Sequence, residues 1–314
     1  MSQPHLPCPG VHFSAALLAR VERCVARLGA ARTRREGAGR GRLAGVGEEF
    51  VGHRPYRPGE DLRRLDWNLY ARLDQPHVRI TRREASEAWV VLLDTSASMG
   101  VGPPGKLQRG AEVALALASL GQRRGARVRL VESGGRAGSA GPEVAAPGHM
   151  AGLVTWLAGL RADGGVGIGA VLGGARARGP GKRPASSWAG RAGRIFLIGD
   201  LLDVEPAQLG ALAGARRGTE CHALQLLAPV EFAPQQAVGA DGTGQADPPA
   251  VVEWRDAESG ARLRSKLDQT AAYELRLEDE LERQRAVCAA HGLGHVCHST
   301  RVPFEELVGE LLGM

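Results

Sequence analysis

Unbroken apolar runs and stretches with helical spacing of apolar residues divide this chain into regular elements. Residues 89–93 and 194–199 are almost entirely apolar, which is typical of strands buried on both faces at the centre of a parallel sheet. Further strands are predicted at residues 77–82, 126–131, 220–227, 251–254, 262–264 and 295–299. Helical spacing of apolar residues marks residues 13–28, 107–122, 150–160, 170–178, 205–216, 271–291 and 304–312. Because the strands alternate with helices, we predict an α/β fold with a doubly wound, mostly parallel sheet and helices on both faces.

The same pattern predicts two parts of unequal size. Residues 1–88 form a helical, basic extension that also contains a short strand, and residues 89–314 form the α/β domain. Within this domain, residues 134–148 are rich in glycine and predict a hairpin or loop. Residues 233–250 are rich in Pro, Gly and Gln, so we expect a flexible insertion there.

A turn at residues 56–59 introduces a short helix in the extension. Glu60 and Asp61 follow this turn and suit the positive N-terminal end of a helix. The apolar side of that helix would comprise Leu62, Leu65 and Leu69.

Composition restricts the class of protein. Hydrophobic residues make up 43% of the 314 residues, enough for a sizeable core, but no apolar run approaches the roughly 20 residues of a membrane-spanning helix. The first residues lack the charged segment and apolar stretch of a signal peptide. The five cysteines are odd in number and scattered, which fits reduced thiols. We therefore expect a cytoplasmic protein that does not contact a membrane.

Positive charge is concentrated in the extension. The chain has a net charge of +6, and residues 1–89 account for all of it, with Arg as their only strongly basic residue type. Such an excess can bind nucleic acid or an acidic partner, or can simply be solvent-exposed. Aromatic residues make up only 4% of the chain, which provides few stacking platforms, so we do not expect nucleic acid as a partner. A mixed charged array either binds a protein partner or ties a turn to its domain: Arg54, Arg57, Arg64, Asp66 and Arg72.

Polar side chains follow the two most apolar strands. Asp94, Ser96 and Ser98 come directly after residues 89–93, and an extended backbone would point all three side chains the same way. Asp200 follows residues 194–199 and would lie within reach if the two strands are neighbours. Carboxylate and hydroxyl oxygens suit Mg²⁺, whose shell a partner's Asp or Glu could complete. This chemistry supports metal-dependent protein binding without catalysis.

These residues carry a family resemblance. Asp94, Ser96, Ser98 and Asp200 resemble the metal-ion-dependent adhesion site (MIDAS) of von Willebrand factor A-type (vWA) domains. Residues 47–50, 54–61 and 64–68, with Ala71 and Arg72, resemble a narrower bacterial family, the domain of unknown function 58. The resemblance implies a vWA-like, Rossmann-like fold and a non-enzymatic adaptor. It also implies a MoxR-type AAA+ ATPase as partner, with a protein client, in chaperone-like remodelling or metal-centre assembly.

One position departs from the adhesion site that the resemblance implies. Val166 stands where a threonine hydroxyl from a middle loop is expected, and an isopropyl group cannot ligate a cation. Gly199 also replaces a common serine beside Asp200. Two alternatives follow: either Mg²⁺ (or Mn²⁺) is still bound, or a metal-free site docks the partner.

Two other kinds of site are weighed against this hypothesis. A Mg²⁺-dependent phosphohydrolase of the haloacid-dehalogenase type also has an aspartate after a buried strand, and residues 199–203 resemble its acidic loop. Such an enzyme needs a second aspartate two positions on as acid and base, where this chain has Ser96. A zinc site could draw on thiol and imidazole groups near the C-terminus, but their spacing matches no standard pattern. Those groups are Cys288, His291, His295, Cys297 and His298.

Overall fold

The structure is a computed structural model, and the part of the chain that it describes comprises residues 10–35, 48–56, 65–83, 87–134, 139–173, 192–214, 219–233, 251–258, 260–266 and 270–313. The chain divides into two compact units. One unit combines residues 1–37 with residues 87–314, and the other comprises residues 38–86.

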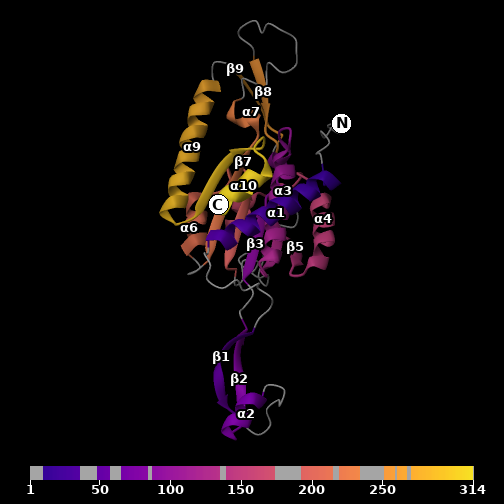
Figure 1. Cartoon of the computed structure of the whole chain (residues 1–314). Coiled ribbons are helices and arrows are strands. Elements are labelled where there is room, and N and C mark those ends of the chain that lie inside the picture. Colours follow the sequence, from indigo (N-terminus) through magenta and orange to yellow (C-terminus); the bar gives the residue numbers. More distant parts are fainter. Residues whose placement is uncertain are drawn as a thin grey trace, which may run out of the picture. The chain divides into compact units, whose positions relative to one another are not determined.

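The larger unit is built on a six-stranded sheet in the order β10-β7-β6-β3-β4-β5 (Figure 1). Numbered along the chain, this is the 3-2-1-4-5-6 order of a Rossmann-type doubly wound sheet. All neighbouring pairs are parallel except β4 and β5. The predicted α/β class with a mostly parallel sheet is therefore confirmed. The strands are β3 (Ala88–Leu93), β4 (Arg127–Glu132), β5 (Ser139–Val144), β6 (Arg194–Gly199), β7 (Glu220–Leu227) and β10 (Gly294–Ser299).

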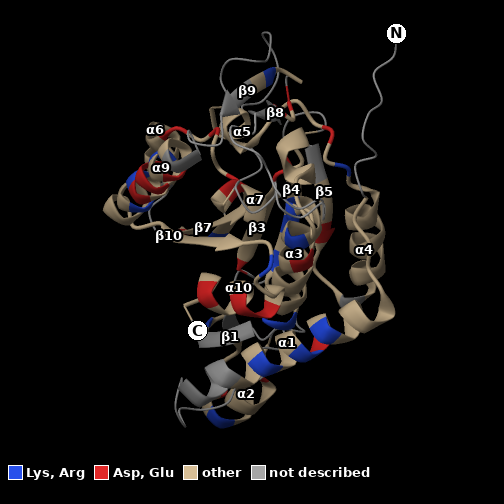
Figure 2. Cartoon of the chain, turned by 90° about the horizontal axis from the view of Figure 1, so that it is seen from above, with Lys and Arg blue, Asp and Glu red and all other residues tan. Residues whose placement is uncertain are grey.

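Helices cover both faces of this sheet, as Figure 2 shows with α9 and α6 on one side and α3, α10 and α1 on the other. The first face carries α5 (Ile168–Gly173), α6 (Pro206–Gly214) and α9 (Thr270–Ala290). The second face carries α1 (Ala15–Arg35), α3 (Lys106–Arg123), α4 (Met150–Gly159) and α10 (Phe304–Leu311).

Strand β3 shows why the apolar run predicts a central strand. Trp89, Val91 and Leu93 belong to the core beneath α3, whereas Val90 and Leu92 belong to the core beneath α5 and α6. Successive side chains of a strand point to opposite faces, so a strand covered on both sides must be apolar at every position. All five side chains are buried.

Helix α1 packs with the sheet unit, although the predicted boundary at residue 88 grouped it with the extension. Leu17, Val21 and Val25 lie in the core that α3 also lines. Arg20 Nε donates to Glu305 Oε1 of α10 at 2.8 Å. The helix also continues to Arg35, beyond the predicted end at residue 28.

The smaller unit contains β1 (Glu48–Pro55) and β2 (His77–Arg83), which pair antiparallel, and α2 (Trp67–Leu73). The predicted helix starts near Glu60, which lies outside the described residues. Its predicted apolar residue Leu65 is not helical, because it forms a β-bridge with Val78. Helix α2 begins only after Asp66, whose Oδ1 accepts hydrogen bonds from Asn68 N and Leu69 N at 3.0 and 3.1 Å. An aspartate that caps the first free N–H groups fixes a helix start at that point.

The remaining elements are short. The predicted hairpin near the C-terminus is confirmed as β8 (Val251–Arg255) and β9 (Arg262–Lys266). One-turn helices also occur as η2 (Ala97–Gly100), η3 (Pro147–His149) and α7 (Pro229–Phe232). The predicted insertion lies outside the described residues except for Ala233. Among the described residues, no helix combines the length and the apolar character that a membrane span requires.

Candidate functional site

The candidate site lies where the strand order of the sheet reverses. Strand β3 is flanked by β4, which follows it in the chain, and by β6, which the chain reaches only after β5. In open α/β sheets, ligands bind at the carboxyl ends of the strands on either side of such a switch point. Asp94 N donates to Ile198 O at 2.8 Å, so the ends of β3 and β6 adjoin as the sequence predicts.

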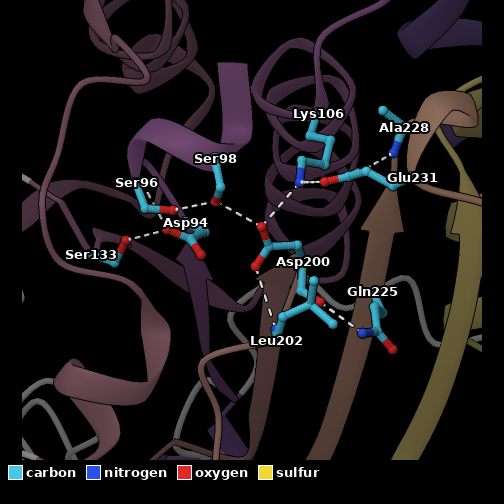
Figure 3. A network of polar contacts seen from close by, with 10 residues as sticks. All are labelled: Asp94, Ser96, Ser98, Lys106, Ser133, Asp200, Leu202, Gln225, Ala228 and Glu231. Carbon is cyan, nitrogen blue, oxygen red and sulfur yellow. Dashed lines mark hydrogen bonds and ion pairs between the residues drawn. The ribbon is translucent and has the colours of Figure 1, made fainter. Parts of the chain in front are cut away.

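The four residues predicted for the metal site form one connected group. Ser98 Oγ donates to Asp200 Oδ2 at 2.7 Å, and the Oγ atoms of Ser96 and Ser98 are 3.0 Å apart (Figure 3). The backbone is not extended throughout this stretch, because η2 begins directly after Ser96. The one-turn helix nevertheless brings the two hydroxyls together, since it folds the chain back over the end of β3.

Asp94 is fully buried, and only one of its carboxylate oxygens has a hydrogen-bond partner among the described residues. Its Oδ1 accepts hydrogen bonds from Ser96 N at 2.9 Å and Ser133 Oγ at 2.7 Å. Its Oδ2 is buried and accepts no hydrogen bond from the described residues. Burial raises the pKa of Asp94, opposed by the hydrogen bond from Ser96 N. A buried carboxylate oxygen without a donor is costly unless a proton or a cation compensates it.

Gly199 leaves room for this carboxylate, and the middle loop pairs with the backbone that follows Asp94. A Cβ atom at Gly199 would lie 3.0 Å from Asp94 Oδ2, so a serine there would crowd the buried oxygen. Gly164 forms a parallel bridge with Ser96, and its carbonyl accepts from Ala97 N at 2.9 Å. The loop that carries Val166 therefore lies beside η2.

Lys106 is a site residue that sequence reasoning missed. Its side chain is 0% exposed, and its Nζ lies 3.0 Å from Asp200 Oδ2 and 2.7 Å from Glu231 Oε1 (Figure 3). Burial alone would lower the pKa of Lys106, but the two carboxylates outweigh it and raise the pKa. The sequence contains one signal for this role. Lys106 is the first residue of α3, where a positive charge is unfavourable next to the positive end of the helix dipole unless an acidic side chain lies nearby.

Asp203 lies near two of the predicted site residues, although the sequence analysis included it only in the acidic loop of the phosphohydrolase alternative, residues 199–203. One carboxylate oxygen from each of Asp94, Asp200 and Asp203 lies within 4.8 Å of the other two. Leu201 has φ 56°, a left-handed conformation that is rare for a branched side chain and turns the chain just after β6. Asp203 is exposed as a whole residue, but partial burial of its carboxyl group, followed by the negative charge of Asp94, raises its pKa to about 6. Carboxylates this close fit a hard divalent cation, because such ions prefer oxygen ligands and Asp94 Oδ2 has no hydrogen-bond partner in the described part of the chain.

The zinc alternative gains no support from the structure. His295 Nε2 lies 3.0 Å from Gln225 Oε1, and His298 Nε2 lies 2.7 Å from Glu310 Oε2. Cys288, which belongs to α9, is buried in an apolar core. Within the described ranges, Asp94, Asp200 and Asp203 are the only group of three or more His, Cys, Asp or Glu side chains whose ligand atoms meet.

The charged array predicted as a partner surface lies in the smaller unit. Arg54 is partly exposed and Arg72 is exposed, whereas Arg57 and Arg64 lie outside the described residues. Asp66 is 7% exposed, caps α2, and its Oδ2 lies 2.9 Å from His53 Nε2. Asp66 thus has a structural role, and partner binding by this array stays a prediction.

Comparison with known proteins bears on the family. A family model described as "Protein of unknown function DUF58" matches residues 52–233, which is more than half of the chain. The chain belongs to the DUF58 family. The matched part of this DUF58 protein contains Asp94, Ser96, Ser98, Asp200 and Lys106, and also Asp203 and the charged array. The predicted family is therefore confirmed.

Curated relatives of the DUF58 protein match over a shorter segment. The uncharacterized proteins Rv1480 of Mycobacterium tuberculosis and Mb1516 of Mycobacterium bovis are each 47% identical to it over 64 residues. This segment covers 20% of the chain and 20% of each relative, so the chain spans about a fifth of the length of the curated relatives it matches. The similarity is local.

Proposed function

We propose that this DUF58 protein is a non-enzymatic protein-binding adaptor with a vWA-like fold. Its docking surface is the sheet edge around Asp94, Ser96, Ser98 and Asp200. The observation that carries this proposal is that two strand ends distant in sequence share one polar network, linked by the 2.7 Å hydrogen bond from Ser98 Oγ to Asp200 Oδ2. The Rossmann-type strand order supports the vWA-like fold.

The adaptor binds its partner by electrostatic attraction and catalyses no reaction. Asp94 and Asp200 would hold a Mg²⁺ or Mn²⁺ ion at the switch point, and the ion would attract a carboxylate of the partner. Ser96 N and Ser133 Oγ fix the orientation of the Asp94 carboxylate. Lys106 Nζ and Ser98 Oγ both donate to Asp200 Oδ2 and so fix the orientation of the Asp200 carboxylate. Two carboxylates whose directions are fixed in advance bind a ligand at a small cost in conformational entropy.

The resemblance supplies the class of partner. A MoxR-type AAA+ ATPase is the partner we propose, and the complex would act on a protein client in chaperone-like remodelling or metal-centre assembly.

A Mg²⁺-dependent phosphohydrolase is the second candidate, favoured by the third nearby carboxylate of Asp203. The second aspartate that such an enzyme needs two positions after its nucleophile is replaced by Ser96, however. The hydroxyl two positions on, Ser96 Oγ, lies 3.0 Å from Ser98 Oγ and cannot act as an acid near neutral pH. A phosphatase screen with Mg²⁺ decides: turnover that Asp94→Asn abolishes would replace the adaptor proposal.

Capture of the partner tests the adaptor proposal directly. The full chain is immobilised and a MoxR-type ATPase from the same organism is passed over it. Asp94→Ala should abolish capture while circular dichroism stays unchanged. Ser98→Ala provides a second variant that keeps the buried carboxylate of Asp94, and it should weaken capture. Asp279→Ala, which removes an exposed carboxylate on α9, is the matched control and should bind as the wild type does. Full capture by a folded Asp94→Ala protein would refute the proposal.

A further inference from the structure

Helix α2 presents large apolar side chains to solvent instead of to a core. None of its residues is buried. Trp67, Tyr70 and Leu73 are 61%, 37% and 54% exposed, and their spacing of three residues places them along one strip of the helix, the α2 apolar face. Among the described residues, seven large apolar side chains are exposed, and three of them belong to this helix of seven residues. Single exposed leucines are ordinary, whereas such a cluster marks an interaction surface.

The helix that carries this face lies at one end of the β1–β2 pair, where its backbone is held at both ends (Figure 1). Asp66 caps the first N–H groups, and its own N–H donates to His77 O of β2 at 2.9 Å. Asp74 takes a left-handed conformation (φ 52°), and its N–H donates to Tyr70 O at 2.9 Å. The rings of Trp67 and Tyr70 contact each other edge to face, with centroids 6.2 Å apart. A face that is ordered before binding loses little conformational entropy on binding, and Trp and Tyr are enriched among the residues that dominate binding energy at protein interfaces.

The charge of the smaller unit indicates what kind of surface covers this face. Residues 38–86 contain ten Arg, no Lys and seven Asp or Glu, a net charge of +3. Arg72 is exposed on α2 itself, and the exposed Asp74 offsets it locally, so the excess is a property of the whole unit. Opposite charges meet across specific interfaces, so an acidic partner surface fits this unit. A second copy of the chain would bring the same positive excess and would be repelled.

A groove in a protein fits the α2 apolar face better than a membrane surface does. Helices that lie on membranes have a polar side rich in Lys and Arg, and their binding grows with apolar area and basic charge. Helix α2 has a single basic residue, Arg72, and only three large exposed apolar side chains. A short helix with anchors about one turn apart is instead typical of recognition in which a helix enters an apolar groove.

We infer that the α2 apolar face docks into an apolar groove bordered by Asp and Glu side chains on a partner protein. Trp67 and Tyr70 are the anchors, and Arg72 pairs with the acidic border. The inference goes beyond the proposed function, because this face and the sheet edge around Asp94 belong to different compact units.

Photo-cross-linking tests the inference without a prior choice of partner. The full chain is expressed in its own organism with p-benzoylphenylalanine in place of Tyr70, and after irradiation the cross-linked peptide is identified by mass spectrometry. We expect one protein whose cross-linked segment combines apolar residues with Asp or Glu. The matched control carries the same group in place of Leu275, which is 64% exposed on α9, and should not cross-link to that protein.

The affinity of the purified chain for that protein then measures the contribution of each side chain. Trp67→Ala should weaken binding by about thirtyfold or more, the loss that defines an anchor residue, whereas Trp67→Phe should retain most of the affinity. Arg72→Glu should weaken binding, most strongly at low salt, and Arg276→Glu on the exposed side of α9 should not. Because the replaced side chains are exposed, thermal unfolding should stay unchanged.

Four results would overturn the inference: no protein cross-linked through the group at Tyr70, a cross-linked segment without acidic residues, cross-linking only to a second copy of the chain, or unchanged affinity in Trp67→Ala. Binding to vesicles of phosphatidylserine and phosphatidylcholine that Trp67→Ala abolishes would identify a membrane surface instead and would also overturn it. Docking of the ATPase at the sheet edge is tested separately with Asp94→Ala, so either proposal can fail alone.

Discussion

At the scale of single residues, the site is defined by charges that the core encloses. Asp94 and Lys106 are both fully buried, and Asp200 links them through the network that also includes Ser98. The positions of Asp94 and Asp200 at the ends of β3 and β6 follow from the sequence, because the carboxyl ends of parallel strands meet at one edge of a sheet. Lys106 could not be found this way, since it owes its role to contacts with Asp200 and Glu231, far along the chain. Asp203 was recognised only as part of the acidic loop at residues 199–203.

Replacement of Lys106 tests how much its ion pairs contribute to the free energy of unfolding. Lys106→Met keeps the volume of the side chain but leaves Asp200 and Glu231 without their shared ammonium. Loss of one partner of a buried ion pair costs about 3–5 kcal/mol of unfolding free energy. Urea denaturation measures it, with Arg276→Met on the exposed side of α9 as the control. A loss no greater than that of the control would show that the pairs do not stabilise the fold.

Asp203 predicts a pH dependence of stability. Its pKa is raised to about 6 in the folded protein, so the folded state keeps a proton that the unfolded chain releases near its ordinary pKa of 3.8. The stability that this proton provides is fully present below about pH 3.8 and is lost progressively as pH rises from there through about 6. In metal-free buffer, Asp203→Asn should therefore melt near the wild type at about pH 3.5 but above it at pH 7.5.

Thermal unfolding in EDTA at the two pH values checks this, with Asp279→Asn as the charge-matched control. A melting temperature of Asp203→Asn below that of the wild type at pH 7.5 would contradict the expected sign.

At the scale of elements, strands and helices differ in how far their limits could be predicted. Residues 89–93 and 194–199 identify β3 and β6 because a strand buried on both faces is apolar at nearly every position. Strand β1 mixes polar and apolar residues without a regular pattern. Its limits are determined by its pairing with β2, so the sequence did not predict them. The leucine spacing predicts too early a start for α2. The better signal is Asp66, because an aspartate directly before a helix caps its first N–H groups.

The cap of α2 can be tested by itself. Asp66→Ala removes the acceptor for Asn68 N and Leu69 N, and loss of such a cap costs about 1 kcal/mol. Amide hydrogen exchange of these two residues should therefore become faster. Asp66→Asn keeps an oxygen acceptor and should restore most of the protection. Unchanged exchange in Asp66→Ala would show that the cap does not hold the helix start.

At the scale of the whole chain, the DUF58 match covers parts of both compact units. The sheet unit contains the three-carboxylate cluster, whereas the smaller unit contains Arg54, Asp66 and Arg72. Fold class and family followed from the sequence because both are encoded by long patterns. The side chains that complete the site did not, because a buried pair such as Lys106 and Glu231 leaves no periodic trace.

The central claim is that the ends of β3 and β6 act as one docking site. The most direct measurement is a double-mutant cycle on the affinity for a MoxR-type ATPase, with Asp94→Asn, Asp200→Asn and the double variant. Residues that share one site should be non-additive, with a coupling energy above about 1 kcal/mol and little further loss in the double variant. Losses that simply add, or no loss in either single variant, would contradict the account.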